Sequence, residues 1–69
     1  MNATELRETI VRVCTPRQAQ VMLMYDSGLS QRKIARRLGI SKGTVADHME
    51  AAQRRIEAAG KEHGDGKNP

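Results

Sequence analysis

The chain has 69 residues, with twelve Lys and Arg against eight Asp and Glu and a formal net charge of +4. This length corresponds to one domain with a thin core, because a chain of about 60 residues buries only roughly 60% of the surface that its unfolded form exposes. Tyr25 is the single aromatic residue, which argues against a platform that stacks the bases of RNA or single-stranded DNA.

The positive charge is concentrated in the middle of the chain. Residues 30–56 hold seven Lys and Arg against two Asp and Glu, whereas residues 1–29 hold three of each and residues 57–69 hold two against three. Such a concentration predicts a polyanionic partner, although a solvated helix surface has a similar composition.

Cys14 is the single cysteine, so no intramolecular disulfide can form and a reducing cytoplasm is the expected setting. It lies in an apolar stripe, where a thiol acts as a small hydrophobe. No apolar run approaches the roughly 18 residues of a membrane span, and no signal peptide is visible at the N-terminus. We therefore expect a soluble, cytoplasmic protein without membrane contact, associated with the nucleoid if its partner is DNA.

The first predicted helix covers residues 1–13. Asn2 or Thr4 is its expected N-cap, and Glu5, three residues after Asn2, completes a capping box. Apolar residues recur at spacings of four and three along one face, at Leu6, Ile10 and Val13.

A second helix is predicted to start at Thr15-Pro16 and to end at about Asp26. Thr is a favoured N-cap and Pro a favoured first helical residue. Its expected inner face carries Val21, Met22 and Tyr25. Ser27-Gly28 ends it, since glycine supplies the left-handed residue that is common after a helix C-terminus.

Two further predicted helices are separated by a glycine. Ser30 caps a short helix over residues 31–38, which buries Ile34, Ala35 and Leu38. Gly39 stops that helix and Ser41 caps the next one, whose apolar stripe has alternating spacings of four and three and comprises Val45, Met49, Ala52, Ile56 and Ala59. We expect this helix to run to about Ala59, Gly60 to end it, and residues 60–69 to form a disordered tail.

Residues 31–50 therefore have the pattern of a helix-turn-helix unit. Ala35 is a small residue where the two helices cross, and Gly39, four residues later, can take a positive φ without strain. Val45, six residues further on, presents a branched apolar side chain to the crossing. The expected fold is all-α: a small helix-turn-helix domain of about four helices over residues 1–59, with a long C-terminal recognition helix.

Residues 15–48, TPRQAQVMLMYDSGLSQRKIARRLGISKGTVADH, resemble the helix-turn-helix domain of LuxR-type transcription regulators and are similar to region four of bacterial sigma factors. The shared features are Thr-Pro-Arg, Gly-Leu-Ser, Ile-Ala-x-x-Leu-Gly-Ile-Ser and Gly-Thr-Val-x-x-His. The resemblance implies a transcription-type DNA-binding module. LuxR-type domains usually continue into a further helix, which is not apparent after Gly60, and 69 residues cannot hold the promoter-melting regions of a sigma factor. We therefore expect a free-standing module.

If the last helix enters the major groove, its N-terminal residues face base edges. Val45 and Met49 point inward, so the residues expected to face the bases are Lys42, Gly43, Thr44, Ala46, Asp47 and Glu50. We expect Lys42 to donate to guanine, Asp47 to accept from cytosine N4, and Thr44 to contact a thymine methyl or a phosphate.

Phosphates are expected to meet the backbone N–H groups behind Ser41 and the side chains of Thr15, Arg17, Gln31, Arg32 and Arg36. His48 is expected to pack at the helix-turn-helix junction and to touch a phosphate. We expect one of Arg36 and Arg37 to be a solvated charge or a partner of Glu50. We expect Arg54 and Arg55 to be surface residues or DNA contacts.

Two functions of different classes fit these residues. The first is a sequence-specific DNA-binding transcriptional regulator, with double-stranded DNA as its partner and a homodimer as its expected assembly. The alternative is a region-four mimic that binds RNA polymerase, a sigma factor or another regulator, which Asp47 and Glu50 on the reading face favour. We expect no enzyme and no cofactor, because the sequence has no Ser/His/acid set, no phosphate loop and no metal-ligand spacing.

Overall fold

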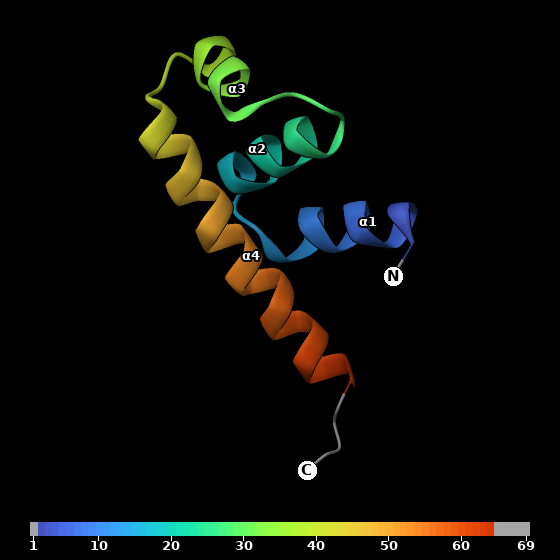
Figure 1. The fold of residues 1–69 in the computed structure, drawn as a ribbon. Coiled ribbons are helices and arrows are strands. Elements are labelled where there is room, and N and C mark those ends of the chain that lie inside the picture. Colours follow the sequence, from blue (N-terminus) through green and yellow to red (C-terminus); the bar gives the residue numbers. More distant parts are fainter. Residues whose placement is uncertain (1, 65–69) are drawn as a thin grey trace.

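The computed structural model describes residues 2–64, which form four helices: α1 Ala3–Val13, α2 Pro16–Asp26, α3 Gln31–Leu38 and α4 Lys42–Gly64. These residues contain no strand, so the predicted all-α fold is confirmed. Figure 1 shows α4 as a long rod with α1 and α2 on one side and α3 at the end where α4 begins. Since α1, α2 and α3 all contact α4, it is the helix against which the other three pack.

The first two helices start at capping boxes. In α1 the Asn2 side chain accepts from the Glu5 N–H at 2.8 Å, and the Glu5 carboxylate accepts from the Asn2 N–H at 3.1 Å. In α2 Thr15 and Gln18 make the same reciprocal pair, at 3.2 and 3.1 Å, and proline is the first helical residue. These bonds satisfy N–H groups that have no partner inside the helix. Asn2, rather than Thr4, is therefore the cap of α1.

The core lies where α2, α3 and α4 meet. Its buried side chains are Val21, Ile34, Ala35, Val45 and Met49. The predicted Leu38 is only half-buried against this cluster. On the α1 side, Ile10 and Ala52 are also fully buried. Burying one such Val or Ile side chain contributes about 1.5–3 kcal/mol, so a few aliphatic residues hold the four helices in their arrangement.

Tyr25 does not lie on the inner face of α2, as its spacing from Val21 predicted. It is 48% exposed, whereas Val21 is fully buried. The reason is that Tyr25 stands in the last turn of α2, where the chain leaves for α3 and the other helices do not cover the ring. Tyr25 lines a surface groove instead.

The prediction that α4 ends before Gly60 is wrong, because the helix continues through this residue to Gly64. Gly60 does not adopt a positive φ, and a Cβ placed there would meet no atom within 4 Å. A glycine inside a helix costs only about 1 kcal/mol relative to alanine, so it does not by itself stop the helix. The rest of the predicted tail, residues 65–69, lies outside the described residues. Although α4 has 23 residues, neither it nor another helix in the described part of the chain is long and apolar enough to cross a membrane.

Candidate nucleic-acid interface

The turn between α3 and α4 depends on Gly39. Its φ is 69°, in the left-handed region, and its N–H donates to the Ala35 carbonyl. The Ile40 N–H also donates to Ala35 O, at 3.0 Å. A Cβ at Gly39 would meet no atom within 4 Å, so the requirement for glycine comes from the backbone conformation and not from a lack of space.

Ser41 fixes the start of α4. Its Oγ accepts from the Thr44 N–H at 3.0 Å and lies 2.8 Å from the Thr44 Oγ1. The predicted cap is therefore present. The Thr44 hydroxyl is already engaged with Ser41 and is half-buried, which gives this residue a structural role at the helix start.

The N-terminal half of α4 has one face in the core and the other in solvent. Val45 is fully buried and Met49 nearly so. At about 100° per residue, the positions opposite Val45 are Gly43, Asp47, Glu50 and Arg54, and all of them are exposed. Lys42 and His48 each lie about 60° from Val45, on either side of the buried stripe; Lys42 is exposed and His48 is half-buried.

The acidic residues on this outer face differ in their partners. Glu50 forms an ion pair with Arg54 one turn further on, at 3.3 Å. Neither Arg36 nor Arg37 pairs with Glu50, contrary to one of the expectations for these residues. Asp47 has no ion-pair partner among the side chains of residues 2–60. The centre of the face therefore carries one uncompensated carboxylate, that of Asp47.

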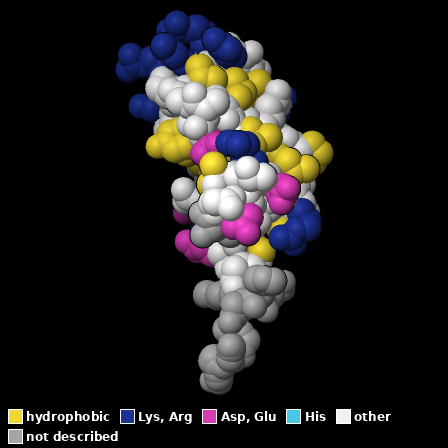
Figure 2. All heavy atoms as spheres, turned by 90° about the vertical axis from the view of Figure 1, so that its right-hand side faces the viewer, with side chains coloured by type: hydrophobic (Ala, Val, Ile, Leu, Met, Phe, Trp, Pro, Cys, Tyr) yellow, Lys and Arg dark blue, Asp and Glu magenta, His cyan; other side chains and the backbone are white. Residues whose placement is uncertain are grey.

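The cations of α3 lie beside the start of α4. Arg32, Lys33, Arg36 and Arg37 are all exposed on this eight-residue helix. Figure 2 shows a large group of Lys and Arg side chains at the end of the molecule that α3 forms, with acidic side chains nearer its middle. The structure thus brings Arg32 and Arg36 to the same end of the molecule as Ser41, Lys42 and Gly43.

Thr15 and Arg17 lie away from that end. The neighbouring Cys14 has its Sγ 4.0 Å from the carbonyl oxygen of Ala52, and Ala52 is ten residues, or about 15 Å, along α4 from Lys42. Thr15 caps α2, and the Arg17 guanidinium donates to Gln20 at 3.4 Å. Any DNA contact of Thr15 or Arg17 is therefore separate from the cluster around Lys42.

Arg55 has a structural role that sequence reasoning left open. Its guanidinium donates to the carbonyl oxygen of Val13 at 3.0 Å and so joins α4 to the C-terminal end of α1. Burial raises the pKa of the neighbouring Cys14 thiol, and the positive charge of Arg55 partly offsets this by lowering it. Val13 and Arg55 are 42 positions apart in the sequence, so no local pattern indicates this contact.

No group of three or more His, Cys, Asp and Glu side chains in the described part of the chain has an arrangement that would hold a metal ion.

The family model of bacterial regulatory proteins of the luxR family matches residues 12–63, which include α2, α3 and most of α4. Over 41 residues the chain is 44% identical to "Putative HTH-type transcriptional regulator YhjB" of Escherichia coli (strain K12). This match covers 59% of the present chain but only 20% of YhjB, so the chain spans about a fifth of the length of this relative. No solved structure matches the chain significantly. The residues matched by the family model contain the whole helix-turn-helix unit.

Proposed function

Because the chain belongs to the luxR family of bacterial regulatory proteins, we propose that it is a sequence-specific DNA-binding transcriptional regulator whose helix α4 enters the major groove. Membership of the family confirms the LuxR-type resemblance of residues 15–48. The observation that carries the proposal is the N-terminal half of α4, which Ser41 caps and the core fixes through Val45 and Met49. Its outer face is exposed beside the cations of α3. A helix held in this way can present side chains to base edges.

Base recognition falls to the exposed side chains of the first two turns of α4. Lys42 donates to O6 or N7 of guanine, and Asp47 accepts from N4 of cytosine. Gly43 and Ala46 bring little or no side chain, which lets the helix approach the bases closely. Thr44 contacts a thymine methyl group or a phosphate with the part of its side chain that Ser41 leaves free.

Phosphate contacts set the orientation of α4 without reading sequence. The N–H groups behind Ser41 face one phosphate, and Gln31, Arg32 and Arg36 lie next to them at the same end of the molecule. His48, on the opposite flank of α4, touches the other strand. Thr15 and Arg17 meet the backbone further along. With about six phosphates neutralised, log K would fall with log salt at a slope near −5.

One uncompensated carboxylate at the centre of the face weakens non-specific binding. Asp47 repels phosphates unless its oxygens accept from a base, whereas the Glu50 carboxylate is already paired with Arg54. A monomer makes few base contacts, so a homodimer that binds two half-sites has the higher affinity. Double-stranded DNA is thus the proposed partner, in the cytoplasm and on the nucleoid.

The uncompensated Asp47 also supports a second candidate function, that of a module that binds RNA polymerase, a sigma factor or another regulator. Under this alternative, the outer face of α4 meets a protein and not DNA. The double variant Lys42→Glu, Arg36→Glu separates the two functions. It abolishes retention of duplex DNA under the first proposal, and it leaves capture of a polymerase subunit intact under the second.

A single charge reversal tests the contact at the start of α4. Lys42→Glu removes a donor to the bases, and a good base contact contributes about 1–3 kcal/mol, so affinity for the selected duplex should fall by about tenfold or more. Arg12→Glu changes the net charge by the same amount but stands in the last turn of α1. We expect it to change affinity by about twofold or less, because exposed charges beyond a Debye length are screened.

Fluorescence polarisation of a labelled duplex measures both variants, and circular dichroism checks that both remain folded. Equal losses of affinity in the two variants would mean that only net charge matters, which would contradict a reading role for Lys42.

A further inference from the structure

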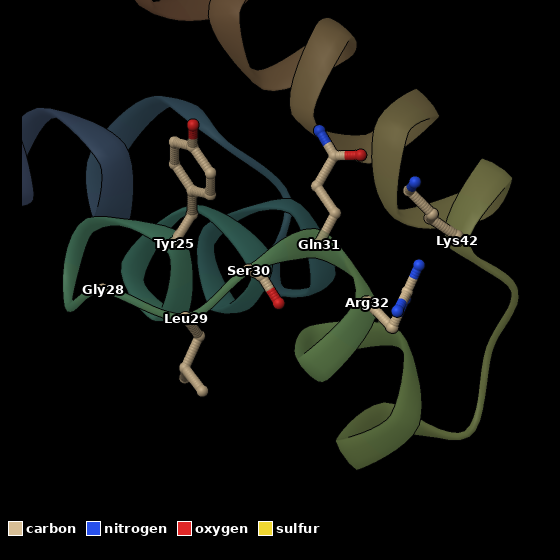
Figure 3. Close-up of a pocket in the computed structure, with 7 residues that line it drawn as sticks. All are labelled: Tyr25, Gly28, Leu29, Ser30, Gln31, Arg32 and Lys42. Carbon is tan, nitrogen blue, oxygen red and sulfur yellow. The ribbon is translucent and has the colours of Figure 1, made fainter.

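A groove on the surface lies where α2 ends and α3 and α4 begin. Its lining comes from the last turn of α2, the loop before α3, and the first residues of α3 and α4. Its polar side chains are those of Tyr25, Ser30, Gln31, Arg32 and Lys42. In Figure 3, Tyr25 stands at one end, Arg32 and Lys42 at the other, and Gln31 between them. The groove therefore combines an aromatic ring with two cations from different helices.

Three of the groups that line this groove, Tyr25, Arg32 and Lys42, lack side-chain partners in the described part of the chain, whereas the Ser30 hydroxyl accepts from the Lys33 N–H at 3.2 Å. Between residues 2 and 60, the ion pairs join Arg7 to Asp26 and Arg54 to Glu50, which leaves Arg32 and Lys42 without a carboxylate. The Tyr25 hydroxyl makes no hydrogen bond to any described residue, although the ring is only 48% exposed. A groove that has a half-covered aromatic ring with an unused donor at one end and two unpaired cations at the other is suited to an extended anionic ligand with an apolar part.

The position of the groove matches the path of a DNA strand. When a helix-turn-helix docks, its second helix lies in the major groove while its first helix crosses the backbone. The groove is bounded by the N-terminal ends of both of these helices, α3 and α4. In that docking geometry, one strand at the edge of the major groove would pass along it.

We propose that this groove binds the sugar–phosphate backbone of one DNA strand, with Tyr25 as a contact that the helix-turn-helix pattern does not indicate. Arg32 donates to phosphate oxygens, and Lys42, at the same end of the groove, reaches on to the base edge. The Tyr25 hydroxyl donates to a phosphate oxygen, and the Tyr25 ring packs against a deoxyribose. This inference rests on the proposed function and extends the DNA surface to the C-terminal end of α2. An acidic peptide is the competing ligand chemistry.

Three variants of the full chain test the contact on a duplex to which the wild-type protein binds. Tyr25→Phe removes only the hydroxyl, so affinity should fall by about tenfold, the effect of one hydrogen bond to a charged group at the low end of its range. The salt dependence should not change, because the hydroxyl carries no charge. Tyr25→Ala also removes the ring and should weaken binding further. Arg32→Gln should reduce the slope of log K against log salt by about 1.

Arg37→Gln is the matched control, since it removes the same charge from the same helix. Residues 32 and 37 are separated by about 140° around α3, and Arg37 does not line the groove. Its slope should equal that of the wild type. Circular dichroism and thermal unfolding of each variant exclude loss of fold as the cause of a change in affinity.

The possible failures are distinguishable. If the wild-type chain binds duplex DNA and both Tyr25 variants bind it equally well, the groove inference is overturned while the proposed function stands. If Tyr25→Ala retains DNA affinity but loses capture of an acidic polymerase peptide, the groove binds protein and the inference is again overturned. If the wild-type chain retains no duplex even at low salt, both the inference and the proposed function fail.

Discussion

Gly39→Ala isolates the backbone requirement of the helix-turn-helix. Gly39 has a φ of 69°, and a Cβ there would meet no atom within 4 Å, so no steric clash contributes to the effect. An L-residue in this left-handed region destabilises the folded state by roughly 1–2 kcal/mol. Alanine also reduces the conformational entropy of the unfolded chain, which offsets about 0.4–1 kcal/mol of this loss. The free energy of unfolding should therefore decrease by about 1 kcal/mol, which corresponds to a decrease of about 4–8 °C in Tm for a domain of this size.

Gly60→Ala provides the matched control, because the same chemical change is made where the backbone is helical. Gly60 has no positive φ, and its Cβ position is also open. Alanine should stabilise this part of α4 by up to about 1 kcal/mol. Urea unfolding followed by circular dichroism at 222 nm measures both variants. The reasoning is refuted if Gly39→Ala is as stable as the wild type, or if the two substitutions shift stability in the same direction.

Three further outcomes follow from the same structure. Asp47→Asn removes the uncompensated carboxylate, so we expect non-specific affinity to rise by about twofold or more and the preference for a cytosine-containing site to weaken, as competition binding would show. Arg54→Ala frees the carboxylate of Glu50, and the same assay should show weaker binding; unchanged binding would place Glu50 away from DNA. Because the pKa of Cys14 is raised in the folded chain, the free energy of unfolding should decrease as the pH rises above the ordinary thiol value of about 8.5. A Cys14→Ala variant should lack that decrease, and if it does not, Cys14 is not its source.

Local sequence rules predicted the parts of this fold that depend on neighbouring residues. The cap at Thr15, the left-handed Gly39 and the cap at Ser41 all involve contacts within five residues. The buried pair Ile34 and Val45 follows from a helical period that is visible in the sequence. Such features are set by the backbone geometry of one or two turns, so the sequence alone is sufficient to locate them.

Features that depend on distant elements were not predictable in this way. Tyr25 has the spacing of a core residue, but its burial depends on the direction that the chain takes from the end of α2 to the start of α3. Arg55 contacts the carbonyl of Val13 across 42 positions. Glu50 was expected to pair with Arg36 or Arg37, but it pairs with Arg54, one turn along its own helix. Gly60 was expected to end α4 because glycine often does, but only a positive φ makes that role obligatory. The groove and the contact between Arg55 and Val13 therefore required the structure.

Binding to random-sequence duplex DNA at two salt concentrations, followed by sequencing of the retained fraction, tests whether α4 reads DNA sequence. We expect an enriched motif whose affinity falls steeply with salt, with a slope near −5 for about six phosphate contacts. A motif with two related half-sites would also establish a homodimer on DNA. Absence of both enrichment and retention at low salt would exclude DNA as the partner of α4 and favour a protein.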